Sequence, residues 1–224
     1  MSKIEFYLKY IFRLERGRYN NWRFYLPVIG VSIGVASVIL TFAIMQGMET
    51  EVFKKLELIN FSSQIFDDTF VKANNNDFYN VINKKGIISS RGEHRVVNIK
   101  AIEKFEDFKN NTLSGYLIES MTDTNGIILG SGLASRLDAN IGDTIALVSP
   151  ENVNYLTTVP TSVTLRIIGI YKLQLLNYDD QFIFTNLSVG EILFPSAYKQ
   201  IYSYLSPNEI KMKYNNIKIV KTWK

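Results

Sequence analysis

The hydrophobic positions of this chain form one long uninterrupted run near the start and many short runs after it. No charged residue occurs between Phe24 and Met48. A helix over residues 24–48 is about 37 Å long, at about 1.5 Å per residue, and a bilayer core is about 30 Å thick. The pattern therefore predicts a transmembrane helix there. The best later run, Val163–Leu176, is interrupted by Arg166 and Lys172, so we expect one crossing.

The segment before this run has a different pattern. Ile4, Leu8, Ile11 and Phe12 recur at helical spacing with basic residues between them, which is typical of an amphipathic helix lying in a membrane surface. We expect residues 1–23 to form a cytoplasmic amphipathic segment. It either binds membrane lipid or contacts a cytoplasmic partner, and the pattern leaves both interpretations open.

The charge distribution orients the predicted span. The first 23 residues hold an excess of basic side chains that accounts for the whole formal net charge of +4. By the positive-inside rule, the N-terminus is cytoplasmic and residues 49–224 form an extracytoplasmic (periplasmic) domain. The apolar run is too long for a cleaved signal peptide, and no small-x-small cleavage site follows it. The remaining chain carries equal numbers of acidic and basic residues, so we expect no nucleic-acid partner.

Small residues inside the predicted span are spaced for helix packing. Gly30 and Gly34 form a GxxxG pattern, which lets a second helix backbone approach closely. The alternative interpretation is that small residues are simply frequent in membrane helices.

The rest of the chain predicts a mixed α+β domain. The span is expected to continue as a helix to Glu57, and residues 72–77 to form a polar loop. Alternation and short buried runs predict strands over residues 96–102, 127–129, 144–148, 163–170, 182–185 and 217–220. Short helices are expected over residues 133–137 and 196–205. This order is α+β and not a regular βαβ alternation.

The sequence contains no set of residues that predicts catalysis. It has no Cys, a single His94 and no G-x-x-x-x-G-K-[ST] pattern, so we expect no enzyme activity, cofactor or metal site. The glycines after Ile127–Leu129 resemble a dinucleotide fingerprint, but the following helix is too short, and a tight turn explains them better. The carboxylate pairs Asp67–Asp68 and Asp179–Asp180 are interpreted as solvated turn residues.

The segment Pro150–Thr164 is the best candidate for a binding site. It lies between two predicted strands and mixes Tyr155, Leu156, Val159 and Pro160 with small hydroxyl residues. Exposed apolar side chains on a projecting hairpin suit protein recognition. The alternative is that these side chains fold back on the domain.

Several motifs together resemble the N-terminal part of the permease subunits of lipoprotein-releasing ABC transporters. The matching stretches are Tyr10–Arg18, Gly30–Glu51, Gly126–Pro150, Ile168–Tyr171, Asn177–Asp179 and Ile219–Trp223. The resemblance implies an inner-membrane subunit that works with a paired permease subunit and a cytoplasmic ABC ATPase. Such a complex passes lipoproteins to a periplasmic lipoprotein carrier.

In this family a projecting hairpin, the hook, grips the carrier. By position, the resemblance assigns the hook to Tyr155, Leu156, Thr157, Thr158, Val159, Pro160, Thr161 and Ser162. It also implies that Gly30 and Gly34 pack against the partner subunit. Family members continue into three further membrane helices, which this sequence lacks, so we expect a fragment, half of a split gene or a degenerate copy. The alternative function is a single-span anchored periplasmic scaffold, or a permease-like subunit of a related export or cell-wall-regulating ABC complex.

Overall fold

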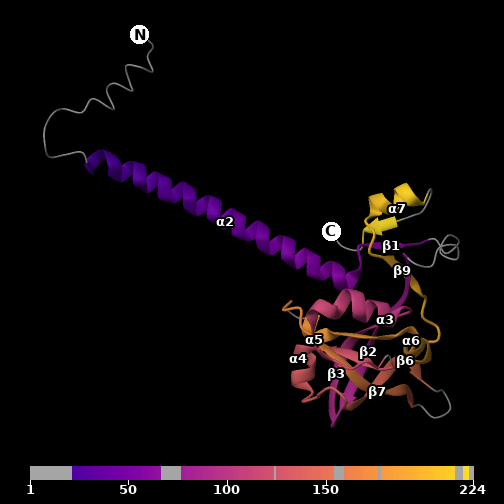
Figure 1. Ribbon diagram of the computed structural model, residues 1–224. Helices are drawn as coiled ribbons and strands as arrows, with labels where there is room; N and C mark the ends of the chain where they lie inside the picture. Colours follow the sequence, from indigo (N-terminus) through magenta and orange to yellow (C-terminus); the bar gives the residue numbers. More distant parts are fainter. Residues whose placement is uncertain are drawn as a thin grey trace, which may run out of the picture. The chain divides into compact units, whose positions relative to one another are not determined.

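The computed structural model describes residues 22–66, 77–123, 125–153, 159–175, 178–214 and 219–221 (Figure 1). The predicted amphipathic helix before residue 22 and most of the loop over residues 72–77 lie outside these ranges. The chain divides into two compact units, Met1–Glu51 and Val52–Lys224. Each unit is described separately.

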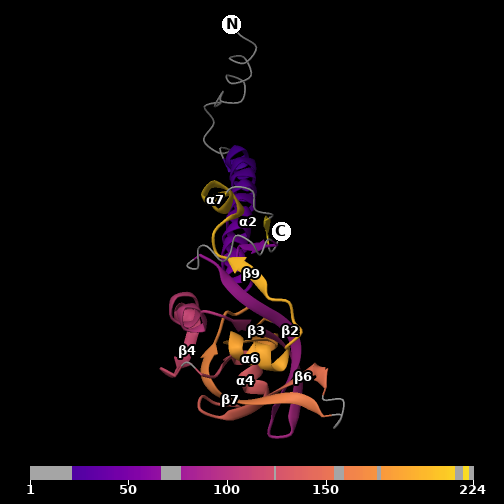
Figure 2. The same cartoon turned by 90° about the vertical axis from the view of Figure 1, so that its right-hand side faces the viewer.

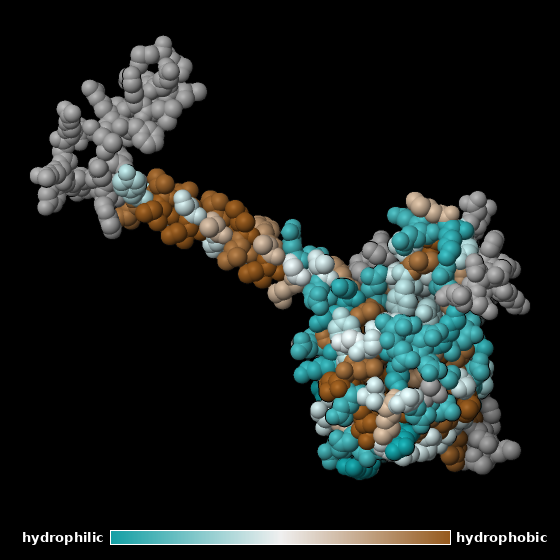
Figure 3. All heavy atoms as spheres, viewed as in Figure 1, coloured by the Kyte–Doolittle hydropathy of each residue, from teal (hydrophilic) through white to brown (hydrophobic). Residues whose placement is uncertain are grey.

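The first unit contains most of the helix α2, Trp22–Asn60, which is long and apolar enough to cross a membrane. Large hydrophobic side chains along it are exposed, as its mostly brown surface in Figure 3 shows. The hydroxyls of Ser32, Thr41 and Thr50 each donate to the carbonyl four residues earlier, at 2.8 Å. Such internal bonds satisfy polar groups where no water is present. The crossing at residues 24–48 stays a prediction.

The second unit is built on a ten-stranded mixed sheet (Figures 1 and 2). Its strands are β1 (Ser63–Ile65), β2 (Tyr79–Ser90), β3 (Glu93–Ile102), β4 (Leu117–Ser120), β5 (Ile127–Gly130), β6 (Thr144–Val153), β7 (Pro160–Tyr171), β8 (Phe182–Asn186), β9 (Gln200–Ser203) and β10 (Ile219–Lys221). The order is β10-β1-β9-β2-β3-β8-β5-β7-β4, and β6 pairs with both β2 and β7. The pairing through β6 closes a circuit of six strands: β2, β3, β8, β5, β7 and β6.

Short helices connect and cover these strands. They are α3 (Phe105–Asp107), the π-helix η2 (Phe108–Leu113), the 3-10 helix η3 (Ser114–Tyr116), α4 (Ser131–Arg136), α5 (Tyr178–Gln181), α6 (Leu187–Leu193) and α7 (Pro207–Lys213). The side chain of Asn186 caps α6 by accepting from Ser188 N. A capping box between Ser206 and Glu209 begins α7.

Two main hydrophobic clusters lie on opposite faces of the strands. One gathers side chains such as Ile99, Ile145 and Ile167 with residues of α4 and α6. The other gathers Phe61 and further aromatic and aliphatic side chains with residues of α3 and η2. Val97, Ile99 and Ala101 of β3 enter the first cluster and Ile102 enters the second, so the end of this strand is buried on both faces.

Most of the predicted elements are confirmed, including the α+β class and the continuation of the helix past Glu57. The helix predicted over residues 196–205 is wrong, since residues 200–203 form the strand β9. There Ile201 and Tyr202 enter different hydrophobic clusters, which requires the alternation of a strand. The helices begin instead at the capping residues Asn186 and Ser206.

Candidate functional site: the β6–β7 hairpin

The segment predicted as a long hairpin does form one. β6 and β7 pair antiparallel from Thr144↔Arg166 to Val148↔Ser162, and pairing resumes at Val153↔Pro160 after an irregularity. The tip, residues 154–158, lies outside the described residues. It holds four of the expected hook residues, Tyr155, Leu156, Thr157 and Thr158.

The other four expected hook residues lie directly before β7 and at its start. Val159 is 59% exposed, Pro160 and Ser162 are exposed, and Thr161 is half-buried. The next apolar residue, Val163, packs instead against the main core cluster. The apolar side chains of this segment therefore divide, with Val159 in solvent and Val163 on the domain.

The base of the hairpin is held on two sides. Glu151 of β6 forms an ion pair with Lys84 of β2 at 2.7 Å. Asn152 donates from its backbone to Ser149 Oγ at 3.3 Å and from its side chain to the carbonyl of Ile192, in α6, at 3.5 Å. The sequence analysis missed these anchoring contacts because no local pattern links Lys84 to Glu151, 67 residues later, or Ile192 to Asn152, 40 residues earlier.

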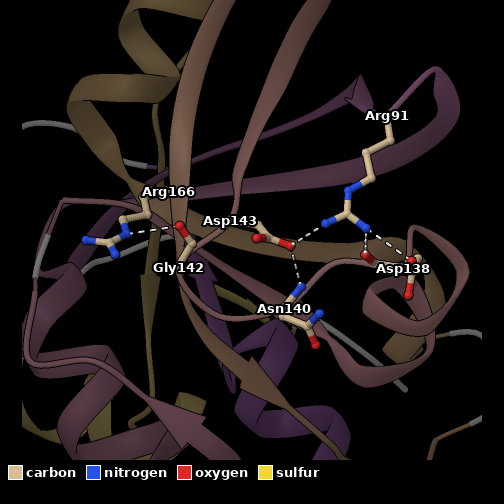
Figure 4. Close-up of polar contacts among 6 residues, drawn as sticks. All are labelled: Arg91, Asp138, Asn140, Gly142, Asp143 and Arg166. Atoms are coloured by element: carbon tan, nitrogen blue, oxygen red, sulfur yellow. Dashed lines mark hydrogen bonds and ion pairs between the residues drawn. The ribbon is translucent and has the colours of Figure 1, made fainter.

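A polar network fixes the start of β6, at the end away from the hairpin tip (Figure 4). Arg91 donates to the carbonyl of Asp138 at 3.0 Å, to its carboxylate at 3.1 Å and to Asp143 Oδ2 at 3.4 Å. Asp143 also accepts from Asn140 N at 2.9 Å, and Arg166 Nε donates to the carbonyl of Gly142 at 3.1 Å. These contacts tie the α4–β6 loop to the β2–β3 turn, which gives the network a structural role.

The glycine-rich turn after β5 packs against protein backbone. A Cβ on Gly130 would lie 2.1 Å from the carbonyl oxygen of Asp179. The carboxylate of Asp179 accepts from Leu173 N at 3.0 Å and Gln174 N at 2.9 Å, and Asp180 pairs with Arg136 at 2.6 Å. The interpretation of this pair as solvated turn residues is therefore wrong, because both carboxylates bind protein groups. Asp67 and Asp68 lie outside the described residues.

The remaining candidate residues are not part of this site. His94 is exposed on β3, and the described residues include no cluster of three or more metal-ligating His, Asp or Glu side chains. A Cβ on Gly30 or Gly34 would meet nothing within 4 Å. A surface this open has room for a partner helix, and that role stays a prediction.

Curated relatives of the chain are transport proteins. The chain is 22% identical over 209 residues to the lipoprotein-releasing system transmembrane protein LolC of Neisseria meningitidis serogroup B, covering 84% of this chain and 50% of the relative. It is 24% identical over 224 residues to the transmembrane protein LolE of the same kind of system in Haemophilus influenzae, covering 88% and 51%. The chain thus spans about half the length of these relatives.

Two solved structures are also similar to the chain. One is the extracellular domain of the noncanonic ABC-type transporter YknZ from Gram-positive bacteria, with a TM-score of 0.43 and 11% identity, covering 67% of this chain and 87% of that one. The other is the periplasmic region of MacB from Actinobacillus actinomycetemcomitans, with a TM-score of 0.43 and 12% identity, covering 73% and 89%.

A family model also matches the chain. The model of the MacB-like periplasmic core domain matches residues 26–212, which includes the apolar part of α2 and nearly all of the described sheet. With the LolC and LolE relatives, this match confirms the resemblance to permease subunits of lipoprotein-releasing ABC transporters. The chain belongs to the family of the MacB-like periplasmic core domain.

Proposed function

We propose that this chain is a membrane subunit of an ABC transporter that releases lipoproteins from the inner membrane to a periplasmic carrier, and that the β6–β7 hairpin binds the carrier. The observation that carries the proposal is the hairpin itself, with exposed Val159 next to its tip and a base anchored to β2 and α6. The names of the relatives LolC and LolE support the lipoprotein substrate.

The mechanism needs binding and movement, without covalent chemistry in this chain. A cytoplasmic ATPase supplies the energy, and a paired permease subunit packs against α2 at Gly30 and Gly34. The N-terminus is cytoplasmic and the second unit is periplasmic. The hairpin offers strand backbone and apolar side chains to the carrier. Strand backbone can pair with a sheet edge of another protein, and apolar side chains can fill its pockets.

The experiment is photo-crosslinking in the assembled complex. A photoreactive residue at Val159 is expected to capture the carrier. Ile118 is the matched control, because it is 57% exposed, compared with 59% for Val159, and lies on β4, which pairs with the opposite end of β7. Capture at Ile118 and not at Val159 would contradict the proposed hairpin contact.

The second candidate is a subunit of a related export or cell-wall-regulating ABC complex, or a single-span periplasmic scaffold. It is favoured by the breadth of the family match, because the MacB-like core domain model names no lipoprotein. The same crosslinking experiment separates the candidates, since Val159 would then capture a protein that does not accept lipoproteins.

A further inference from the structure

The C-terminal end of α2 accepts hydrogen bonds from side chains on β3 and directly after β9. A helix leaves its last carbonyl groups without partners inside the helix. Lys100 of β3 donates from Nζ to the carbonyl of Ile59 at 2.6 Å and to Asn60 Oδ1 at 2.8 Å. Tyr204, directly after β9, donates its hydroxyl to the carbonyl of Leu58 at 3.2 Å. Two consecutive carbonyls of the last turn thus bind groups from the sheet region.

Lys100 is buried in the domain and Tyr204 is half-buried. Lys100 is 4% exposed, its Nζ lies 5.2 Å from the centre of the Phe182 ring, and burial lowers its pKa to about 7. Burial also raises the pKa of Tyr204. A buried amine or hydroxyl costs free energy unless it is hydrogen-bonded. Each donor therefore needs its helix-end carbonyl as an acceptor, and each carbonyl needs its donor.

The residue that follows the helix is inserted into an aromatic cluster. Phe61 has φ +59°, a conformation that glycine or asparagine usually supplies at a helix end. Its side chain is 1% exposed. Its ring centroid lies 5.2 Å from that of Tyr202, 4.6 Å from Tyr204, 5.7 Å from Tyr79 and 6.3 Å from Phe108. Ring packing holds the unfavourable backbone conformation in place.

We propose that Phe61, Lys100 and Tyr204 form a joint that passes movement of α2 into the sheet, and that Lys100 and Tyr204 are positioning residues for transport. This helix-end joint rests on the proposed transporter function. α2 is one helix from Trp22 to Asn60, so its membrane portion continues directly into the joint.

A chain of strand pairings connects the joint to the hairpin. Lys100 lies on β3, which pairs with β2 over ten residues. β2 pairs in turn with β6, with Ile87 opposite Val148. β6 is the strand that enters the hairpin. Two strand pairings therefore lie between the joint and the hairpin.

The first test measures how well the contacts of the joint protect the end of α2, in the absence of partner proteins. Hydrogen exchange of residues 52–62 is followed in the full chain in lipid nanodiscs, for Lys100→Met and Tyr204→Phe. We expect exchange about tenfold faster in Lys100→Met, and a smaller increase in Tyr204→Phe, because each variant leaves a helix-end carbonyl without its donor.

The matched control is Lys109→Met. Lys109 is also 4% exposed and also donates to backbone carbonyls, but these belong to Met121 and Asp123, after β4, and not to the end of α2. This variant is expected to leave exchange in residues 52–62 unchanged. Equal exchange rates of residues 52–62 in Lys100→Met and Lys109→Met would overturn the proposal that Lys100 holds the end of α2.

The second test uses the complete complex. Lys100→Met is expected to lower ATP-driven lipoprotein release severalfold while crosslinking of the carrier at Val159 stays at the parent level. Faster exchange with normal release would overturn the role of the joint in transport. If the parent complex itself released no lipoprotein, the proposed function would fail, and the exchange measurement would still decide whether the joint exists.

Discussion

The ion pair between Lys84 and Glu151 joins the long strand β2 to the base of the β6–β7 hairpin, with Nζ and Oε2 2.7 Å apart. Both side chains are at least one-third exposed, so the pair contributes at most about 1 kcal/mol to stability. Its greater effect is on orientation, because Glu151 lies between the ordered pairing at Val148 and the hairpin tip.

Reversing one charge of this pair is expected to loosen the hairpin. Lys84→Glu places two carboxylates together, and a nitroxide label on Val159→Cys should become more mobile in electron paramagnetic resonance spectra. The label is specific because the sequence has no Cys. The double variant Lys84→Glu with Glu151→Lys restores opposite charges and should restore the spectrum. Equal mobility in all three proteins would exclude an orienting role for the pair.

Lys100 should make stability depend on pH. Burial lowers its pKa from 10.5 to about 7, whereas the unfolded chain keeps the usual value. Between these two pH values the unfolded state holds a proton that the folded state has released, so the free energy of unfolding rises with pH. The slope is at most about 1.4 kcal/mol per pH unit, and below pH 7 this contribution is constant.

The pH dependence is measured by urea unfolding of the parent and Lys100→Met at pH 6, 7, 8 and 9. The stability difference between them should be constant from pH 6 to 7 and then shift in favour of the parent as the pH rises. Parallel curves over the whole range would show that Lys100 keeps an ordinary pKa in the folded protein.

Gly130 is expected to tolerate no side chain. A Cβ there would lie 2.1 Å from the carbonyl oxygen of Asp179, so Gly130→Ala should lower the free energy of unfolding by about 1–3 kcal/mol. Gly115→Ala is the control, because a Cβ at that position meets nothing within 4 Å. Thermal unfolding of both variants tests this, and equal melting temperatures would contradict the close contact.

Local patterns predicted the elements whose own apolar residues follow a recognisable pattern. The short apolar run Ile127–Leu129 is a fully buried strand, and the alternation before Ile102 is β3. The uncharged run after Phe24 gave the helix α2. In each case the pattern of apolar residues within the segment itself is enough to indicate the element.

The strand β2 was not predicted because its pattern makes sense only with its partners. Lys84, Lys85 and Gly86 interrupt its apolar residues, which in isolation indicates a turn. In the structure Lys84 pairs with Glu151, and a Cβ on Gly86 would lie 2.3 Å from the side chain of Ile99 on β3. The reason for each residue lies on another strand, far away in the sequence.

Only part of the candidate site was predicted, because the rest depends on contacts between distant segments. The hairpin and its exposed Val159 followed from the local mixture of apolar and hydroxyl residues. The residues that fix its base, including Asn152 and Lys84, depend on contacts with α6 and β2. The helix-end joint is harder still to predict, since nothing near Lys100 in the sequence indicates that it binds the end of α2.

The GxxxG pattern of α2 gives a last prediction, which concerns the paired permease subunit. Gly30 and Gly34 are open positions on the helix surface, and a close helix–helix contact depends on the absence of side chains there. The double variant Gly30→Leu with Gly34→Leu should weaken association with the paired subunit about tenfold, as measured by co-purification at several detergent concentrations. Gly47→Leu is the control, because Gly47 lies on the same helix and is equally open but outside the GxxxG pattern. Equal retention of the paired subunit by both variants would show that α2 does not use these glycines as a packing surface.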